Sequence, residues 1–339
     1  MLLNFSLKNL KSSKRTFVFA EAGNNHEGSL RIAKKIILEA NKCGVDAVKF
    51  QTFVPSLYYS NDQKERLKKL KKFQLSYDDF KKLIDYGKNI GITVFSTPFD
   101  NESAEFLNEY QKFFKISSGD NNFFPLIEQI ISYNKPVIIS TGLSDYSLLK
   151  KVYNLFKKKW GYFTDDKFLV FLHCVSAYPT KLEDANLQKI LSLKKKFKDV
   201  IVGYSDHVIG IEAAYIASIM GANIIEKHFT LDRKFSNFRD HKLSADPKQM
   251  KTLITRIKKF YNATGTGNLM IQDCEKENLL PTRRSLAASR SLNAKKKIIE
   301  NDLIWVRPGN GIIEKKEIIG KKIKKKMKFS ESFSKSNLL

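Results

Sequence analysis

Hydrophobic and polar positions alternate in two ways along most of the chain. Short hydrophobic runs rich in β-branched residues, typical of buried strands, are separated by stretches whose hydrophobic residues recur every three or four positions, as in amphipathic helices. The stretch RIAKKIILEANKCG, after the first run, is one such helical pattern. We expect eight strands, near residues 16–22, 46–53, 93–99, 113–119, 136–141, 168–175, 199–205 and 223–229.

Eight strands alternating with helices predict an α/β fold, and specifically a parallel (β/α)8 TIM barrel. A doubly wound open sheet is the alternative, but it usually has fewer strands, and its glycine-rich phosphate-binding turn is missing after the first strand. A last barrel helix is expected near residues 247–262. The predicted barrel domain therefore spans residues 1–265.

Two parts of the sequence depart from this pattern. Residues 283–339 consist of short β-prone pieces broken by turns, such as LIWVRPGNGI, and predict a small separate domain after a linker at residues 266–282. A lysine-rich insertion, Pro55–Ser76, follows the second strand. In a barrel such an insertion lies on the active-site face, so it is either a lid or a solvated helical loop.

Composition narrows the function classes only slightly. The 60 Lys and Arg residues against 35 Asp and Glu give a net charge of +25, which attracts nucleic acid, anionic membranes or phosphorylated small molecules. A nucleic-acid binder would show clustered arginines with aromatic platforms, whereas the excess here is dispersed lysine on helical stretches. We therefore expect neither a nucleic-acid nor a membrane partner.

The cysteines and the N-terminus bear on localisation. Cys43, Cys174 and Cys274 are odd in number and widely spaced, so no disulfide framework or metal knuckle is implied. The N-terminal residues have a short apolar start followed by basic residues, the reverse of a signal peptide, and no later run approaches the roughly 18 apolar residues of a membrane span. These patterns predict a cytoplasmic protein.

Polar residues are unusually dense at the carboxyl ends of the expected strands, where barrel enzymes build their sites. A buried strand without a function should be almost wholly apolar, so this density indicates a site. The residues concerned are Glu21, Asn24, Asn25, His26, Lys49, Gln51, Ser96, Thr97, Lys115, Ser117, Ser118, Asp120, Ser140, Thr141, His173, Ser176, Ser205, Asp206, His207, Glu226, Lys227 and His228.

His207 and His228 give the sharpest inference. They end consecutive strands of one right-handed βαβ unit, and neighbouring strands lie about 4.8 Å apart, so the two side chains should be spatial neighbours at the rim. Two imidazoles there could share one cation with open positions for substrate and water, although two separately hydrogen-bonded histidines are the alternative. Because no cysteine lies on those two strands, Mn²⁺ or Mg²⁺ fits better than a closed zinc site.

Lys49 and Lys115 lie within strands and cannot be buried without an anionic partner or a shifted pKa. They could cradle a phosphate and a carboxylate together with hydroxyl groups, or one of them could be the Schiff-base lysine of an aldolase. Glu21 and Glu226 could move protons, and the sequence does not say which is the acid. The hydroxyl groups concerned belong to Ser96, Thr97, Ser140 and Ser205.

Ten collinear stretches over nearly the whole chain resemble the sialic acid synthase family. They are FVFAEAGNNHEGS, DAVKFQTF, FSTPFDNES, FKISSGD, VIISTG, LHCVSAYPTKLEDANL, VGYSDH, IEKHFT, DHKLS and RPGNG. The resemblance implies a TIM barrel followed by a β-rich antifreeze-like (SAF) domain at residues 283–339. It also implies Mn²⁺ held by His207 and His228.

The resemblance further implies roles for individual residues. Phosphoenolpyruvate would be bound by Lys49, Thr97, Lys115, Ser118, Ser140 and Ser205. The sugar would be faced by Glu21, Gln51 and Tyr178, with Asp120 and Asp240 as further candidates. The family forms homodimers with swapped C-terminal domains, in which Arg307 would reach the partner's site and hold the acyl group of the sugar.

The implied reaction condenses phosphoenolpyruvate with an N-acetylated amino sugar. The metal polarises the open-chain aldehyde, carbon 3 of phosphoenolpyruvate attacks it, water adds at carbon 2 and phosphate leaves, giving a 2-keto-3-deoxy nonulosonate. The family's GPDHK is FRDHK here, and NNHEG replaces VNHNG, so the sugar end is altered. N-acetylmannosamine and the diacetamido precursor of legionaminate remain candidates, and the pseudaminate precursor ranks last.

Overall fold

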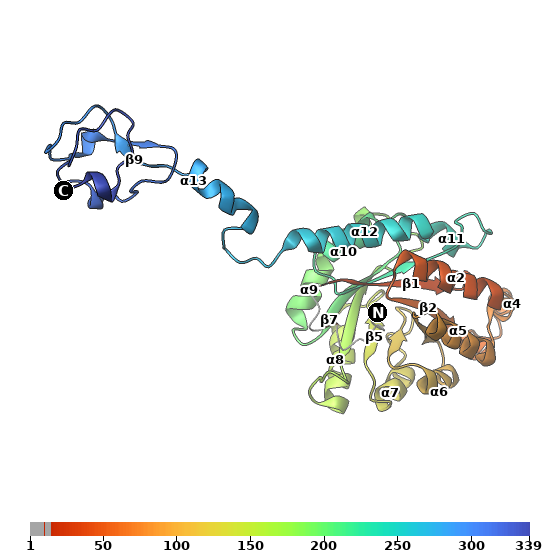
Figure 1. The fold of residues 1–339 in the computed structure, drawn as a ribbon. Coiled ribbons are helices and arrows are strands. Elements are labelled where there is room, and N and C mark those ends of the chain that lie inside the picture. Colours follow the sequence, from red (N-terminus) through yellow and green to blue (C-terminus); the bar gives the residue numbers. More distant parts are fainter. Residues whose placement is uncertain (1–9, 11–14) are drawn as a thin grey trace. The chain divides into compact units, whose positions relative to one another are not determined.

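The computed structural model describes residue 10 and residues 15–339, and most of the basic N-terminal segment discussed above lies outside the described residues. The chain divides into two compact units, Met1–Gly265 and Thr266–Leu339. In unit 1 a parallel sheet of eight strands is surrounded by helices (Figure 1). The strands are β1 Phe17–Gly23, β2 Ala47–Thr52, β3 Thr93–Pro98, β4 Phe114–Ile116, β5 Val137–Ser140, β6 Leu169–Cys174, β7 Ile201–Asp206 and β8 Ile224–His228.

The strand order is β3-β2-β1-β8-β7-β6-β5-β4, and β3 lies next to β4, so the sheet closes into a barrel. The expected eight strands and the parallel α/β barrel are thus confirmed. The fourth strand is shorter than expected, because residues 117–120 form a turn instead of continuing β4. The helices of unit 1 are α2 Leu30–Cys43, α3 Pro55–Tyr58, α4 Lys64–Phe73, α5 Tyr77–Asn89, α6 Asn101–Tyr110, α7 Phe124–Ser132, α8 Tyr146–Trp160, η1 Glu183–Ala185, α9 Gln188–Lys196, α10 Glu212–Ile219, α11 Arg239–Leu243 and α12 Pro247–Thr264.

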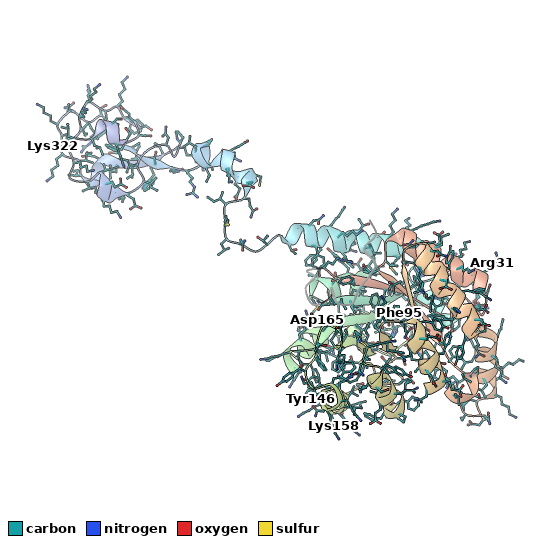
Figure 2. All side chains as sticks on the ribbon, turned by 60° about the horizontal axis from the view of Figure 1, so that its bottom comes forward. Arg31, Phe95, Tyr146, Lys158, Asp165 and Lys322 are labelled. Atoms are coloured by element: carbon teal, nitrogen blue, oxygen red, sulfur yellow. The ribbon has the colours of Figure 1, made fainter. Side chains whose placement is uncertain are left out.

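Two hydrophobic cores stabilise the barrel. The larger one fills the layer between the sheet and the helices, as the amphipathic patterns require. The second fills the lumen toward the amino ends of the strands, where the rings of Phe19 and Phe95 meet edge to face at 5.4 Å. Phe95 lies among closely packed side chains, whereas Lys158 lies on the outside of the unit (Figure 2). The lumen is thereby closed at one end, and its polar residues occupy the other.

Unit 2 is a small body with its own core, which includes Leu286, Ile298, Ile323 and Phe333. Its two strands pair in an antiparallel manner. Residues 266–282, expected as a linker, are grouped with this unit and contain two short helices. The elements are η2 Asp273–Asn278, α13 Leu279–Thr282, β9 Ser285–Ala288, η3 Glu300–Asp302, β10 Leu303–Val306, η4 Lys315–Glu317 and η5 Lys335–Asn337.

None of the helices among the described residues is long and apolar enough to span a membrane. The three cysteines are free thiols, with Cys43 and Cys174 buried and Cys274 exposed.

A buried ion pair links two strands on the outer face of the barrel. Lys227 Nζ lies 2.8 Å from Asp206 Oδ2, and both side chains are fully buried. Asp206 also accepts hydrogen bonds from the Tyr204 hydroxyl and the Val208 amide, while Lys227 donates to the Val208 carbonyl. These two polar strand-end residues therefore serve the packing between β7 and β8 and do not enter the lumen.

Replacing Lys227 with Met should destabilise the barrel by about 3–5 kcal/mol, because the Asp206 carboxylate would stay buried without its cation. Denaturant unfolding followed by circular dichroism measures this change. The exposed Lys35, which lies on α2, provides the control variant Lys35→Met. Adding Asp206→Asn to Lys227→Met should recover part of the loss, and equal stability of the two single Met variants would contradict the prediction.

Candidate active site

The polar half of the lumen is built by side chains from alternate positions of neighbouring strands. Glu21 on β1 is in register with Lys49 on β2 and with His228 on β8. Ser205 on β7 is in register with Glu226 on β8. Because side chains two residues apart on a strand share a face, these residues point into the same space above the lumen core.

Lys49 binds the first carboxylate of the site. Its Nζ lies 2.6 Å from Glu21 Oε2 and 3.0 Å from Thr97 Oγ1, and all three side chains are buried. Gln51 donates a hydrogen bond of 3.3 Å to the other oxygen of Glu21, and Asn24 donates one of 2.8 Å to Gln51. The chain of contacts therefore runs from β3 across β2 to the loop after β1.

Glu226 lies between the two lysines. Its carboxylate oxygens are 3.6 Å from Lys49 Nζ and 3.8 Å from Lys115 Nζ, and it accepts a hydrogen bond of 2.9 Å from Ser205. Lys115 also donates to Ser140 Oγ at 2.7 Å. Two lysines, two carboxylates and the hydroxyls of β3, β5 and β7 thus form one buried network.

The four charged groups differ in their pKa values. Burial raises the pKa of Glu21 to about 7 against the opposing effect of Lys49. Burial also acts on Glu226, but Lys115 and Lys49 outweigh it and lower the pKa of this carboxyl. Burial lowers the pKa of a lysine, but at Lys49 the carboxylates of Glu21 and Glu226 outweigh burial and raise the pKa. At Lys115 burial is the larger effect, and the pKa is lowered. Glu21 is therefore the group suited to hold a proton near neutral pH, and Glu226 stays ionised.

His207 and His228 lie at the rim, with ring centroids 5.3 Å apart, so the adjacency expected from the βαβ unit is confirmed. His207 Nδ1 lies 2.7 Å from the Val175 carbonyl, which accepts its proton, so Nε2 is the nitrogen left for a ligand. Burial lowers the pKa of this imidazole, but Cys174 and the Val175 carbonyl outweigh burial and raise it. Burial and the neighbouring His207 lower the pKa of His228, which favours the neutral imidazole that binds metals.

The histidine pair fits a divalent cation as a partial ligand set. His228 Nδ1 is buried and has no hydrogen-bond partner among the described residues, as expected of a nitrogen that awaits a ligand. Within the described part of the chain, however, no three His, Cys, Asp or Glu side chains converge as a complete metal site. A cation held here would need substrate or water to fill its remaining positions.

The other candidates surround this network. Tyr178 packs on the His207 ring at 4.1 Å, and the Arg239 guanidinium lies 5.0 Å from the Tyr178 ring. Arg239 also pairs with Asp240 at 3.4 Å, and burial raises the pKa of that carboxyl. Ser118 Oγ accepts a hydrogen bond from the Gly142 amide.

Two predicted site residues, Asp120 and Arg307, lie outside the buried network of lysines and carboxylates. Asp120 accepts a hydrogen bond from the Ser117 hydroxyl in the turn after β4, and burial raises the pKa of its carboxyl. Arg307 belongs to unit 2, which is described separately from the barrel. It precedes Pro308 in a cis peptide bond and follows β10 directly.

Sequence patterns misplaced three polar residues, Asp206, Lys227 and His173, and missed three others. His173 at the end of β6 binds the Ala185 carbonyl and packs against Tyr204, so it has a structural role outside the lumen. Cys174 beside His207, Arg239 on Tyr178 and Tyr58 from the insertion lie at the site without having been predicted. The change of GPDHK to FRDHK was the available signal for Arg239, and the insertion was the signal for Tyr58.

Polar side chains that converge at the carboxyl ends of eight parallel strands define an α/β-barrel enzyme. Residues 36–269 match the family model described as the NeuB family. The chain belongs to this family, which confirms the resemblance to the sialic acid synthases.

Individual relatives and one solved structure agree with this assignment. The chain is 36% identical over 334 residues to the N,N'-diacetyllegionaminic acid synthase of Campylobacter jejuni subsp. jejuni serotype O:2, covering 94% of this chain and 98% of that protein. It is 35% identical over 345 residues to the pseudaminic acid synthase of serotype O:23/36, covering 97% and 98%. The crystal structure of the N-acetylneuraminic acid synthetase of Leptospira borgpetersenii serovar Hardjo-bovis, in complex with citrate, matches with a TM-score of 0.72 and 34% identity, covering 78% and 90%.

The raised pKa of Glu21 predicts a pH-dependent stability. Between the usual value of 4.5 and about 7 the folded protein binds a proton at Glu21 that the unfolded chain has released, so rising pH weakens folding. From pH 4.5 to 8 the wild type should lose on the order of 3 kcal/mol relative to Glu21→Gln, which mimics the protonated form. Urea unfolding of both proteins across this range measures the difference, and parallel pH profiles would contradict the assignment.

Proposed function

We propose that this protein is a nonulosonic acid synthase, which condenses phosphoenolpyruvate with an N-acetylated amino sugar and releases phosphate. The observation that carries the proposal is the buried pair of lysines in the polar half of the lumen, which lies beside two adjacent histidines at the rim. The printed names of the relatives, which are synthases of legionaminic and pseudaminic acids, support the same reaction type.

The lysines and hydroxyls would hold the phosphate and carboxylate of phosphoenolpyruvate. Lys49 and Lys115 supply the positive charge, and the side-chain hydroxyls of Thr97, Ser118, Ser140 and Ser205 surround them with hydrogen-bond partners. In the dry lumen such charge-assisted bonds are stronger than in water. An entering anion would compete with Glu226 for both ammonium groups.

His207 and His228 would hold a divalent metal, most suitably Mn²⁺, with Mg²⁺ as the alternative. When bound, such an ion supplies Lewis-acid polarisation of an oxygen on the acceptor. Tyr178 packs against both imidazoles, with ring centroids 4.1 and 6.2 Å away, and so restricts their orientation. The chain's own contribution is to keep His228 neutral and to bind His207 Nδ1 to the Val175 carbonyl, which leaves Nε2 for a ligand.

The two carboxyl groups would have different roles in proton transfer, because the pKa of Glu21 is raised and that of Glu226 is lowered. As carbon 3 of phosphoenolpyruvate forms a bond with the aldehyde carbon, the aldehyde oxygen gains a proton, which Glu21 can supply. Water then adds at carbon 2 and loses a proton, and the carbon–oxygen bond to phosphate breaks to leave the 2-keto acid. Glu226, held ionised by two lysines, would stabilise the positive charge that develops at carbon 2.

The Schiff-base aldolase considered from the sequence is not favoured. Burial lowers the pKa of Lys115, as such a lysine requires, but Ser140, Glu226 and the Ile116 carbonyl surround its ammonium group. A Schiff-base lysine is typically desolvated by apolar neighbours or by another cation. The relatives are named as synthases, which also favours the condensation reaction.

The identity of the acceptor sugar is the more specific part of the proposal. Because the identities to the legionaminic and pseudaminic acid synthases differ by one percentage point, overall similarity does not rank their substrates. We propose N-acetylmannosamine or 2,4-diacetamido-2,4,6-trideoxymannose, in line with the sequence of the sugar-end loops. We further infer a cytoplasmic enzyme, since phosphoenolpyruvate is an intracellular metabolite.

Phosphate release from phosphoenolpyruvate tests this function directly. With one of the two sugars and Mn²⁺, the wild type should release phosphate, and chelation or His207→Ala should reduce the rate by at least about 100-fold. Enzyme treated with borohydride in the presence of the sugar, and then freed of both, should keep its activity, because no lysine adduct would be trapped. A folded, metal-loaded wild type that releases no phosphate with either sugar would refute the proposal.

We also propose a homodimer in which Arg307 completes the partner's site, where it would bind the acyl group of the sugar. Arg307 begins the RPGNG stretch, and Asn310 and Gly311 of that stretch line a depression of about 560 Å³ together with Lys324–Lys326. This surface of unit 2 is therefore polar and basic, as expected for contact with an anionic substrate or product.

Mixing two inactive variants tests the exchange of unit 2. His207→Ala and Arg307→Ala, dissociated together and reassociated, should recover about a quarter of the wild-type activity, because half of the dimers would be mixed and each would hold one intact site. Each variant alone, treated in the same way, is the control. If Arg307 served its own barrel, the mixture would stay as inactive as its parts.

A further inference from the structure

The insertion Pro55–Ser76 is docked over the barrel mouth through its second helix, α4. Gly28, in the loop after β1, has φ +81°, and a Cβ added there would lie only 2.2 Å from the Lys72 carbonyl, so the two backbones are in close contact. Phe73 packs edge to face on Phe238 at 5.0 Å, and Lys69 Nζ lies 4.5 Å from the same ring. The insertion is therefore fixed to the loops after β1 and β8.

The first helix of the insertion, α3, places Tyr58 above the ends of β2 and β3. The Tyr58 ring packs on Phe99 at 4.7 Å and on Phe53 at 6.0 Å, and these two residues directly follow β3 and β2. The loop is tied down by a hydrogen bond of 2.7 Å from the Val54 amide to Asp100. The same two strands carry Gln51 and Thr97, so Tyr58 is held by the backbone segments that position the candidate site.

The Tyr58 hydroxyl remains available to a ligand. It makes no hydrogen bond to any residue that the structure describes, although its ring is largely buried. Burial raises the pKa of this phenol, and the charge of Asp120 adds to the effect, while Tyr178 and Arg239 are also close enough to influence it. A neutral hydroxyl there can both donate and accept a hydrogen bond, and because Tyr58 is partly exposed a ligand can reach it.

These neighbours come from different sides of the mouth. Asp120 follows β4, Tyr178 follows β6 and Arg239 begins α11 after β8, whereas Tyr58 comes from the segment after β2. A reacting aldehyde must lie near the two histidines and the lysine-bound phosphoenolpyruvate at the strand ends. The carbons of the acceptor farthest from the aldehyde then extend toward the loops, which is where Tyr58 lies.

We propose that Tyr58 is a specificity-determining residue whose hydroxyl hydrogen-bonds the substituent on carbon 4 of the acceptor sugar or, in N-acetylmannosamine, the hydroxyl on carbon 6. The proposal rests on the synthase function put forward above. It assigns the insertion a role in choosing the acceptor, and it assigns Tyr58 no part in the chemical step.

Tyr58→Phe tests the inference, because it removes one hydroxyl and keeps the ring contacts with Phe99 and Phe53. The KM for the acceptor should rise about 3- to 10-fold, the value of one hydrogen bond, while kcat and the KM for phosphoenolpyruvate stay within about twofold. Tyr59, which stacks on Tyr58 at 4.8 Å and faces Arg66, provides the matched control Tyr59→Phe, which should behave as the wild type.

Deoxy acceptors separate direct contact from an indirect effect. One of the two deoxy forms of N-acetylmannosamine, either 4-deoxy or 6-deoxy, lacks the hydroxyl that Tyr58 contacts. With that sugar the difference in acceptor KM between the wild type and Tyr58→Phe should disappear. An equal penalty with both deoxy sugars, an unchanged acceptor KM, or an equal effect of Tyr59→Phe would overturn the proposal. A wild type that condenses no acceptor would instead refute the synthase function on which the proposal rests.

Discussion

The barrel depends on balancing four buried charges in a space that has no room for bulk water. Lys49 and Lys115 can be buried only because Glu21 and Glu226 accompany them, and the carboxylates are tolerable only beside the lysines. Two of these groups are less readily charged than usual, because burial raises the pKa of Glu21 and lowers the pKa of Lys115. An anion that bears several negative charges would relieve the lysines of this compromise, which makes the network suited to binding one.

The fold meets this demand by dividing a single lumen into two halves. Toward the amino ends of the strands, rings such as Phe19 and Phe95 exclude water and give the site a dry base. Toward the carboxyl ends, the same strands present Glu21 and Lys49. Side chains on the opposite face of β7 and β8 make a separate pair, Lys227 and Asp206, so the charges that stabilise the sheet do not disturb those that bind.

The sequence predicted what depends on strand order and could not predict what depends on contacts between loops. The eight strands and the adjacency of His207 and His228 follow from hydrophobic periodicity and from the handedness of a βαβ unit. Whether a polar strand-end residue faces the lumen is set by a register of one residue, which is why His173 was grouped with the site although it binds the Ala185 carbonyl. The position of Tyr58 follows from docking of an insertion onto several loops, so the sequence marked the insertion but not the residue within it that reaches the site.

This division between strands and loops also explains how members of one family can take different sugars. In this chain the lysines, carboxylates and histidines lie on rigid strands, where a displacement of about 1 Å would be costly to any reaction that they carry. Arg239, by contrast, stacks on Tyr178 from a loop in which the glycine and proline of GPDHK are replaced, and it pairs with Asp240. A guanidinium introduced at that position changes the charge and the hydrogen-bond donors at the mouth without moving any strand residue. Acceptor choice can therefore change through the loops after β2 and β8 while the reaction at the strand ends stays the same.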